Sequence, residues 1–254
     1  MSETKFPTED ISLPSAGWFY DPESPLASGQ IELKYLTAKE EDILTSSNLI
    51  QKGLVIDRLL ESLIVNKGIS FTDLLIGDKN AIMIASRILG YGKDYDVRIT
   101  CPACGVVSDT KVDLTSLEDR KIDEPKVKGV NSFEYTLPMS KKCITFKLLT
   151  QGDEDKIDKE VASYRKVNAE IDRTLTTRLK HIITAVDGDD NSANIRNFVD
   201  NEFLARDSKA FRNHYQSITP DIDLLIRHHC KNCDDERRVA LPIGIDFFWP
   251  DSGV

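Results

Sequence analysis

The sequence predicts an α+β fold in which helical segments alternate with short antiparallel hairpins. Three observations support this class. The 254 residues, of which 40% are apolar and 30% charged, have the composition of a globular protein long enough to bury a core. Apolar residues recur at helical spacing in several segments. Short alternating runs precede and follow each of two cysteine pairs, as the strands of a hairpin would.

These patterns divide the chain into consecutive regions, with a cysteine hairpin on either side of a helical insertion. We expect an extended N-terminal arm and first strand at 1–36, a helical region at 37–92, a first cysteine hairpin with a strand pair at 93–150, the helical insertion at 151–219, and a second cysteine hairpin with a C-terminal strand at 220–254.

The N-terminal region combines an aromatic, turn-rich segment with one strand. Turn-forming residues are dense between residues 13 and 26, which excludes a helix, and Ile31–Tyr35 alternates as a strand does. Trp18, Phe19 and Tyr20 are consecutive, and neighbouring side chains of an extended chain point to opposite sides. We therefore predict that these aromatic residues carry a partner contact. The alternative is that the arm folds back over the protein's own core.

Three helices are expected in the region 37–92. A capping box of Thr37 and Glu40 begins the first. The third is expected to be capped by Asp78 and to be stopped by Gly90-Tyr91-Gly92. Core packing explains the apolar faces, which are formed by Val55, Leu59 and Leu63 in the second helix and by Ala81, Ile82, Ala85, Ile88 and Leu89 in the third.

Four of the five cysteines form two Cys-x-x-Cys pairs, Cys101 with Cys104 and Cys230 with Cys233. Together they supply the four thiolates that a tetrahedral structural zinc ion needs. The pairs lie much farther apart than in a compact zinc ribbon, but the strand-like flanks place each at the tip of a hairpin. The sequence therefore predicts a split, zinc-ribbon-like site with Zn2+ bound by all four cysteines. Such a closed site leaves no position for catalysis.

Two other interpretations of the cysteines are redox disulfides and unconnected thiols. A redox pair normally begins a helix, and no helical pattern follows either pair here. His228 or His229 could replace one cysteine, although four thiolates already complete the shell. Cys143, outside the pairs, is expected to be a small core residue in a strand.

The region between the cysteine pairs is expected to hold a strand pair, 133–137 with 142–149, followed by a charged helical block. One apolar stripe is assigned to the longest helix of this block and comprises Ile171, Leu175, Leu179, Ile182, Ile183 and Val186. A further helix has Asp207 as its expected cap, and His214 on its apolar face is interpreted as a core or interface histidine. The acidic segment 187–191 lacks the glycine and glutamate of a calcium loop, so a solvated turn is expected.

Charge and motifs restrict the function. The formal charge of −9 disfavours general nucleic-acid binding, and neither a signal peptide nor a membrane-spanning run is recognised, so we expect a protein of a reducing cytoplasm.

No nucleophile elbow, phosphate-binding loop or zinc-protease motif appears, which predicts that the protein is not an enzyme. The alternative function is a zinc-ribbon nucleic-acid binder, based on basic residues near the cysteines: Arg98, Lys111, Arg227, His228, Lys231, Arg237 and Arg238.

Several stretches resemble the baseplate hub and hub-assembly proteins of T-even-like contractile-tailed bacteriophages. They extend over about residues 11–242 and include Leu13–Gly17 with Tyr20, Ile31–Leu44, Ile76–Asn80 with Arg87 and Tyr91–Gly92, Thr177–Lys180, Val186–Gly188 and Phe203–Ala210.

This resemblance implies a non-enzymatic role in building the phage tail baseplate, either as a hub component or as an assembly chaperone for the hub. The expected partners are other baseplate or hub proteins, with no small-molecule substrate. The expected location is the host cytoplasm during assembly and, for a component that is retained, the virion tail baseplate. The resemblance supplies no catalytic residues.

Overall fold

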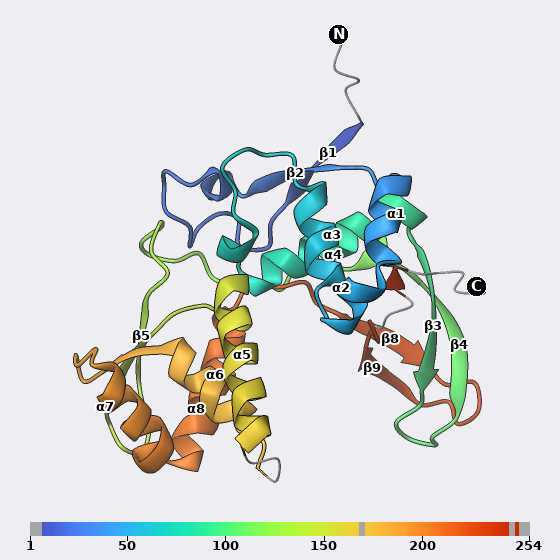
Figure 1. Ribbon diagram of the computed structural model, residues 1–254. Helices are drawn as coiled ribbons and strands as arrows, with labels where there is room; N and C mark the ends of the chain where they lie inside the picture. Colours follow the sequence, from blue (N-terminus) through green and yellow to red (C-terminus); the bar gives the residue numbers. More distant parts are fainter. Residues whose placement is uncertain (1–6, 168–170, 244–246, 249–254) are drawn as a thin grey trace.

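The structure is a computed structural model that describes residues 7–167, 171–243 and 247–248. Figure 1 shows an upper part with α1–α4 and the strands β1 and β2, a lower part with β5 and α5–α8 on one side, and a second lower part with the hairpins β3–β4 and β8–β9 on the other. Helices and small antiparallel sheets thus combine as the α+β prediction requires.

The upper part begins with a β-ribbon and continues into short helices. β1 (Thr8–Ser12) pairs antiparallel with β2 (Gln30–Lys34), and Ile11 lies opposite Ile31. The helices of this part are α1 (Ala38–Leu44), α2 (Ser47–Gln51), α3 (Val55–Leu63) and α4 (Ile76–Tyr91), with short 3-10 turns η1 (Pro25–Ser28) and η2 (Phe71–Asp73). The capping box of Thr37 and Glu40 is confirmed, because the Glu40 carboxylate accepts from the Thr37 backbone N–H at 3.0 Å.

The segment between β1 and β2 is a compact series of turns. Its backbone takes positive φ at Ala16 and Gly17, and η1 follows before the chain enters β2. A Cβ on Gly17 would overlap the Ala27 backbone, which explains the glycine at this turn. The aromatic segment therefore lies folded against the protein between the paired strands.

Two hairpins form the second lower part. β3 (Asp94–Thr100) pairs with β4 (Val107–Asp113), which is followed by η3 (Leu114–Ser116), and β8 (Leu225–His229) pairs with β9 (Glu236–Ala240). The prediction of a hairpin around each cysteine pair is confirmed. At their base, the Arg120 N–H donates to the Asp221 carbonyl and the Asp223 N–H to the Glu118 carbonyl, so the two hairpins are also joined by backbone hydrogen bonds.

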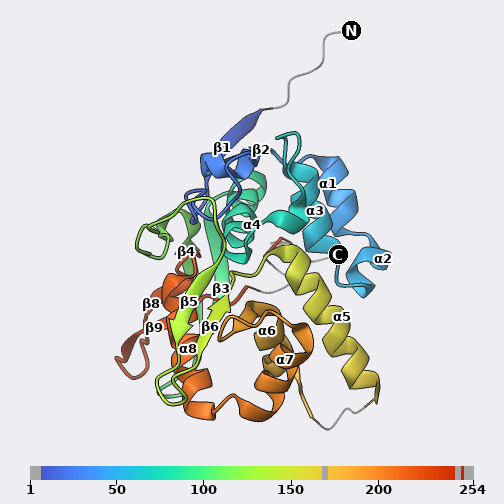
Figure 2. The ribbon, with the colours of Figure 1, turned by 90° about the vertical axis from the view of Figure 1, so that its left-hand side faces the viewer.

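The first lower part is a three-stranded sheet with helices packed on it. Its sheet has the order β5-β6-β7, formed by β5 (Phe133–Thr136), β6 (Cys143–Phe146) and β7 (Ile183–Val186). Its helices are α5 (Gln151–Val167), α6 (Thr174–Ile182), α7 (Ser192–Asn197), the π-helical turn η4 (Phe198–Glu202) and α8 (Ala205–Ile218). Figure 2 shows β5 and β6 side by side on the face turned to the viewer.

Two details of the predicted helices are wrong. The stripe assigned to one long helix ends in α6 at Ile182, and Ile183–Val186 instead pairs with β6 as a strand. Asp78 and Asp207 are not N-caps, because Leu75 and Leu204 occupy those positions. Both carboxylates lie inside the first helical turn, where they accept hydrogen bonds from distant segments.

Buried apolar residues of the described chain form two clusters. The first joins the upper part to the hairpins and reaches from Leu13 to Phe248, whereas the second fills the space between the three-stranded sheet and α5–α8. The rings of Phe133 and Phe146 stack at 5.4 Å between centroids and connect the clusters. In the described residues, no helix has the length and apolar content needed to span a bilayer.

Candidate metal centre

The two cysteine pairs occupy equivalent turns at the tips of the hairpins. In the first turn, the Cys101 N–H donates to the Val106 carbonyl at 2.8 Å and the Gly105 N–H donates to the Cys101 carbonyl at 2.8 Å. In the second, the Cys230 N–H donates to the Asp235 carbonyl at 3.0 Å and the Asp234 N–H donates to the Cys230 carbonyl at 2.9 Å. The same hydrogen-bond pattern thus shapes two turns that are far apart in the sequence.

Each turn needs one residue in the left-handed region. Gly105 has φ of 73° and Asp234, at the equivalent place, has φ of 55°. Glycine adopts this conformation without steric cost, and aspartate is one of the few other residues that tolerate it. The conformation turns the chain sharply after the second cysteine, so that both thiols of a pair point to the same side.

The tips of the hairpins bring all four thiols together. Cys101 Sγ lies 3.7 Å from Cys233 Sγ, and Cys104 Sγ lies 3.6 Å from Cys230 Sγ. All four sulfurs lie within 4.8 Å of one another. A tetrahedral zinc ion with Zn–S bonds of about 2.3 Å separates its sulfurs by about 3.8 Å, so the observed spacing fits such an ion. Four soft thiolates also match the ligand preference of zinc.

The cluster is half covered by protein. Cys101 and Cys230 are buried, whereas Cys104 and Cys233 are exposed. Buried first cysteines and exposed second cysteines follow from the hairpin geometry, because each strand enters its turn from the core. No cysteine of the chain is in a disulfide, including Cys143, which lies half-buried in β6 away from the cluster.

The surroundings of the cluster favour ionisation of one cysteine but oppose ionisation of all four at once. The backbone N–H of Val106 and the side chain of Asn232 donate toward Cys104 and lower its pKa to about 6. The Asp235 N–H donates toward Cys233, but the neighbouring thiols and desolvation outweigh it and raise the pKa of Cys233 to about 12. A bound divalent cation would supply the positive charge that four adjacent thiolates require.

The histidines beside the second pair are not part of the four-residue group. His228 is 4% exposed, and its Nε2 has no hydrogen-bond partner within the described residues. The His229 Nε2 lies 3.5 Å from an Asp234 carboxylate oxygen. The geometry thus supports the four-cysteine set rather than histidine replacement.

The aromatic residues of the N-terminal segment lie at another place, in the upper part of the molecule. Phe19 and Tyr20 are 5% and 7% exposed and belong to the first apolar cluster, whereas Trp18 is half-buried. The Lys128 ammonium lies over the Trp18 ring, 5.6 Å from its centroid. Of the three aromatic residues, only Trp18 retains appreciable exposed surface.

A buried polar network that the sequence patterns do not reveal anchors this segment. The Asp78 carboxylate is fully buried and accepts hydrogen bonds from the Ser15 N–H, the Ser15 hydroxyl and the Tyr20 hydroxyl. The Tyr20 hydroxyl in turn accepts from the Leu75 N–H at 2.9 Å. Burial raises the pKa of Asp78 despite these donors. The network fixes the segment to the first turn of α4 and is structural.

Comparisons with known proteins give one match. The family model described as T4 bacteriophage base plate protein matches residues 20–249, which include both cysteine pairs and most of both apolar clusters. No curated protein and no solved structure matches the chain.

Proposed function

Since the chain belongs to the family of T4 bacteriophage base plate proteins, we propose that it acts in the baseplate hub, as a hub component or a hub-assembly factor, through protein–protein contacts and without enzymatic activity. The observation that carries the proposal is the extent of the family match, which runs from residue 20 to residue 249 of 254. The match thus covers most of the chain rather than one short motif.

A phage mutant that lacks this chain tests the role. Hosts infected with a nonsense mutant should contain tail precursors without complete hubs, and supply of the chain from a plasmid should restore them. Mass spectrometry of purified wild-type virions then separates the two forms of the proposal, because a component is retained in stoichiometric amount and an assembly factor is absent. Normal baseplates in the mutant would refute both forms.

We also propose that Cys101, Cys104, Cys230 and Cys233 bind a single structural zinc ion that joins the regions 93–150 and 220–254 across the helical insertion. The sulfur spacing, the four-thiolate donor set and the matched turns support this assignment. Protein purified without added metal should contain one zinc per chain by elemental analysis. A folded protein with no metal, or with iron, would contradict it.

Substitution of a ligand tests the structural role of this ion. Cys230→Ser should abolish zinc binding and lower the melting temperature of the whole chain in one transition, because the ligands of the two pairs are separated by 126 residues and the first apolar cluster spans both hairpins. Cys143→Ser is the matched control, since Cys143 lies outside the cluster. Early melting of a small separate unit would indicate that the hairpins are independent of the rest.

A partner contact through the N-terminal segment is proposed for Trp18. The core packing of Phe19 and Tyr20 leaves Trp18 as the aromatic side chain with free surface, and large aromatic side chains commonly dominate interface energy. A deletion of residues 1–26 would not test this contact, because it would also remove the buried residues Leu13, Phe19 and Tyr20. A single substitution of Trp18 separates the partner contact from stability.

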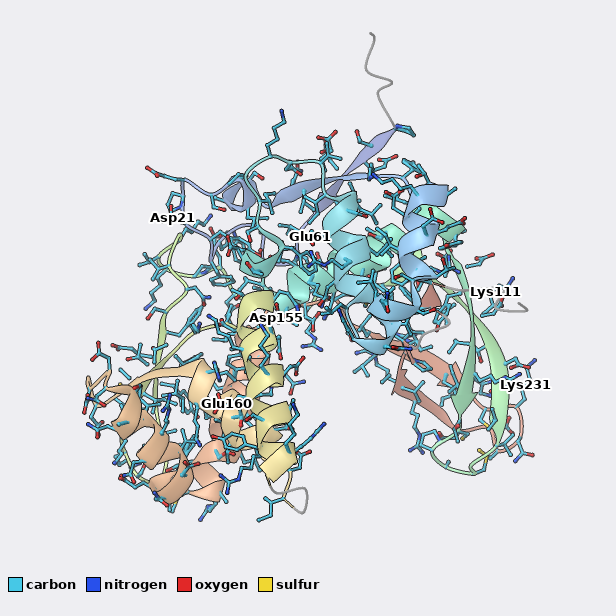
Figure 3. All side chains as sticks on the ribbon, viewed as in Figure 1. Asp21, Glu61, Lys111, Asp155, Glu160 and Lys231 are labelled. Atoms are coloured by element: carbon cyan, nitrogen blue, oxygen red, sulfur yellow. The ribbon has the colours of Figure 1, made fainter. Side chains whose placement is uncertain are left out.

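The surface of the two cysteine hairpins gives little support to the alternative function of nucleic-acid binding. Figure 3 shows Lys111 and Lys231 on the outer side of the hairpins. Most basic residues of this region are already paired with carboxylates: Arg98 with Asp109, Lys111 with Asp94 and Asp96, Arg237 with Asp235, and Arg238 with Asp223. His228 is buried. Phosphate-driven binding needs free cations and weakens steeply with salt, so a binding assay at two salt concentrations tests this alternative.

A further inference from the structure

The outer edge of β5 is an unpaired β-strand edge. β5 is the terminal strand of the sheet β5-β6-β7, and Figure 1 shows it along the outer side of the molecule. The Leu137 N–H donates to the Lys142 carbonyl, and Tyr135 lies opposite Ile144 in the same register. Because backbone groups alternate in direction along a strand, those of Glu134 and Thr136 point away from β6. Both residues are exposed, and no described group bonds to their N–H.

A groove with a mostly apolar lining adjoins the first residues of β5. Its volume is about 590 Å³, and its lining includes Ser132, Phe133 and Glu134 together with Thr145 of the neighbouring strand β6. The lining also contains Val127 and Val130, which are 65% and 47% exposed although they are aliphatic. The groove therefore meets the strand edge at Glu134 and offers exposed aliphatic side chains beside it.

The charges around this groove are predominantly negative. The carboxylates of Asp123 and Glu134 have no ion-pair partner within the described residues, and Lys126 is the corresponding unpaired cation. Glu124 is neutralised by Lys128 at 2.6 Å. Two unpaired carboxylates against one unpaired ammonium favour a basic occupant.

An extended polypeptide satisfies all these features, whereas a small molecule would leave the strand edge unpaired. We propose that the outer edge of β5 and the adjoining groove bind an extended, basic segment of a partner protein, which pairs with β5 as a fourth strand and places aliphatic side chains against Val127 and Val130. This inference deepens the baseplate role and depends on that role only for the identity of the partner.

A synthetic probe tests the proposal on the isolated, full-length protein. The probe is an octapeptide of alternating valine and lysine, acetylated at its N-terminus and amidated at its C-terminus. Saturable binding should slow amide hydrogen exchange at Glu134 and Thr136 by about tenfold or more, because their N–H groups become hydrogen-bonded. A peptide in which glutamate replaces lysine should bind about tenfold more weakly, because it carries the same charge sign as Asp123 and Glu134.

Backbone methylation shows whether a strand is formed. N-methyl groups on alternate residues block one edge of the peptide, and the complementary set blocks the other edge. One methylated peptide should lose binding by about tenfold, whereas the other should retain it, because only one edge faces β5. Failure of the unmodified peptide to bind, or equal binding of both methylated peptides, would overturn the proposal.

Matched protein variants locate the site. Val127→Asn should weaken probe binding by about tenfold, because it places an uncharged polar group where an aliphatic contact is expected. Val107→Asn makes the same change at an exposed valine of β4 and should leave binding unchanged. Weakening by Val107→Asn alone would place the peptide on β4 and refute the β5 site. The baseplate role is tested separately by the phage mutant, so failure of one proposal does not imply failure of the other.

Discussion

Removal of the Tyr20 hydroxyl tests the role of the buried network around Asp78. In the native protein, this hydroxyl donates to the Asp78 carboxylate at 2.5 Å and accepts from the Leu75 N–H at 2.9 Å, while Tyr20 is 7% exposed. Tyr20→Phe retains the ring packing but leaves a buried carboxylate with one donor fewer and a buried N–H without a partner. The variant therefore measures what the hydroxyl contributes to stability, separately from the packing of the ring.

The expected loss of stability comes from one hydrogen bond fewer to the Asp78 carboxylate and from the Leu75 N–H left without a partner. A lost hydrogen bond to a charged group costs about 1.5–3 kcal/mol and a buried group without its partner about 1–3 kcal/mol, so Tyr20→Phe should lower the free energy of unfolding by about 3 kcal/mol. For a chain of this length, about 1 kcal/mol shifts the melting temperature by roughly 2–4 °C, which predicts a decrease of about 6–12 °C.

Urea unfolding and calorimetry of the purified protein provide the measurement. Tyr35→Phe is the matched control, because its hydroxyl bonds to Glu9 at the exposed surface and its loss should change stability by less than about 0.5 kcal/mol. Equal stabilities of the two variants would show that the network around Asp78 does not hold the N-terminal segment in place.

Further predictions concern Asp78, the turns of the metal centre and Trp18. Because burial raises the pKa of Asp78, the folded protein binds this proton more tightly than the unfolded chain, so the stability of the native protein relative to Asp78→Asn should fall as pH rises from about 4, as measured by urea unfolding across pH. Gly105→Ala should lower stability by about 1–2 kcal/mol, whereas Asp234→Gly should maintain or raise it, because both positions have positive φ; thermal melts decide this. Trp18→Ala should reduce hub assembly in infected cells while lowering the melting temperature less than Phe19→Ala does, and equal losses of stability would count against a partner contact.

Local patterns predicted the elements whose structure depends on nearby residues. The capping box at Thr37 and the apolar face of α3 are confirmed, because both are determined within one or two helical turns. The hairpins and the convergence of the cysteine pairs were also predictable, since a metal site imposes a chemical requirement that two repeated turns can reveal.

The remaining features depend on contacts between distant residues. Asp78 and Asp207 resemble N-caps locally, but their carboxylates accept from Ser15 and from the backbone at Met139 and Ser140. Ile183–Val186 continues the helical stripe in sequence, yet pairing with β6 stabilises it as a strand. In both cases tertiary hydrogen bonds outweigh local preference, and no sequence pattern records which distant segment will supply them.

The order in which the chain leaves the ribosome is significant for this fold. The three-stranded sheet and α5–α8 are formed from a continuous stretch, so this part can acquire its core while synthesis continues. By contrast, the first apolar cluster requires Phe247 and Phe248, and the thiol cluster requires Cys230 and Cys233. A chain that ends before Cys230 therefore lacks both Phe247 and Phe248 of the first apolar cluster and half of the thiol cluster, so these two features form only when synthesis is almost complete.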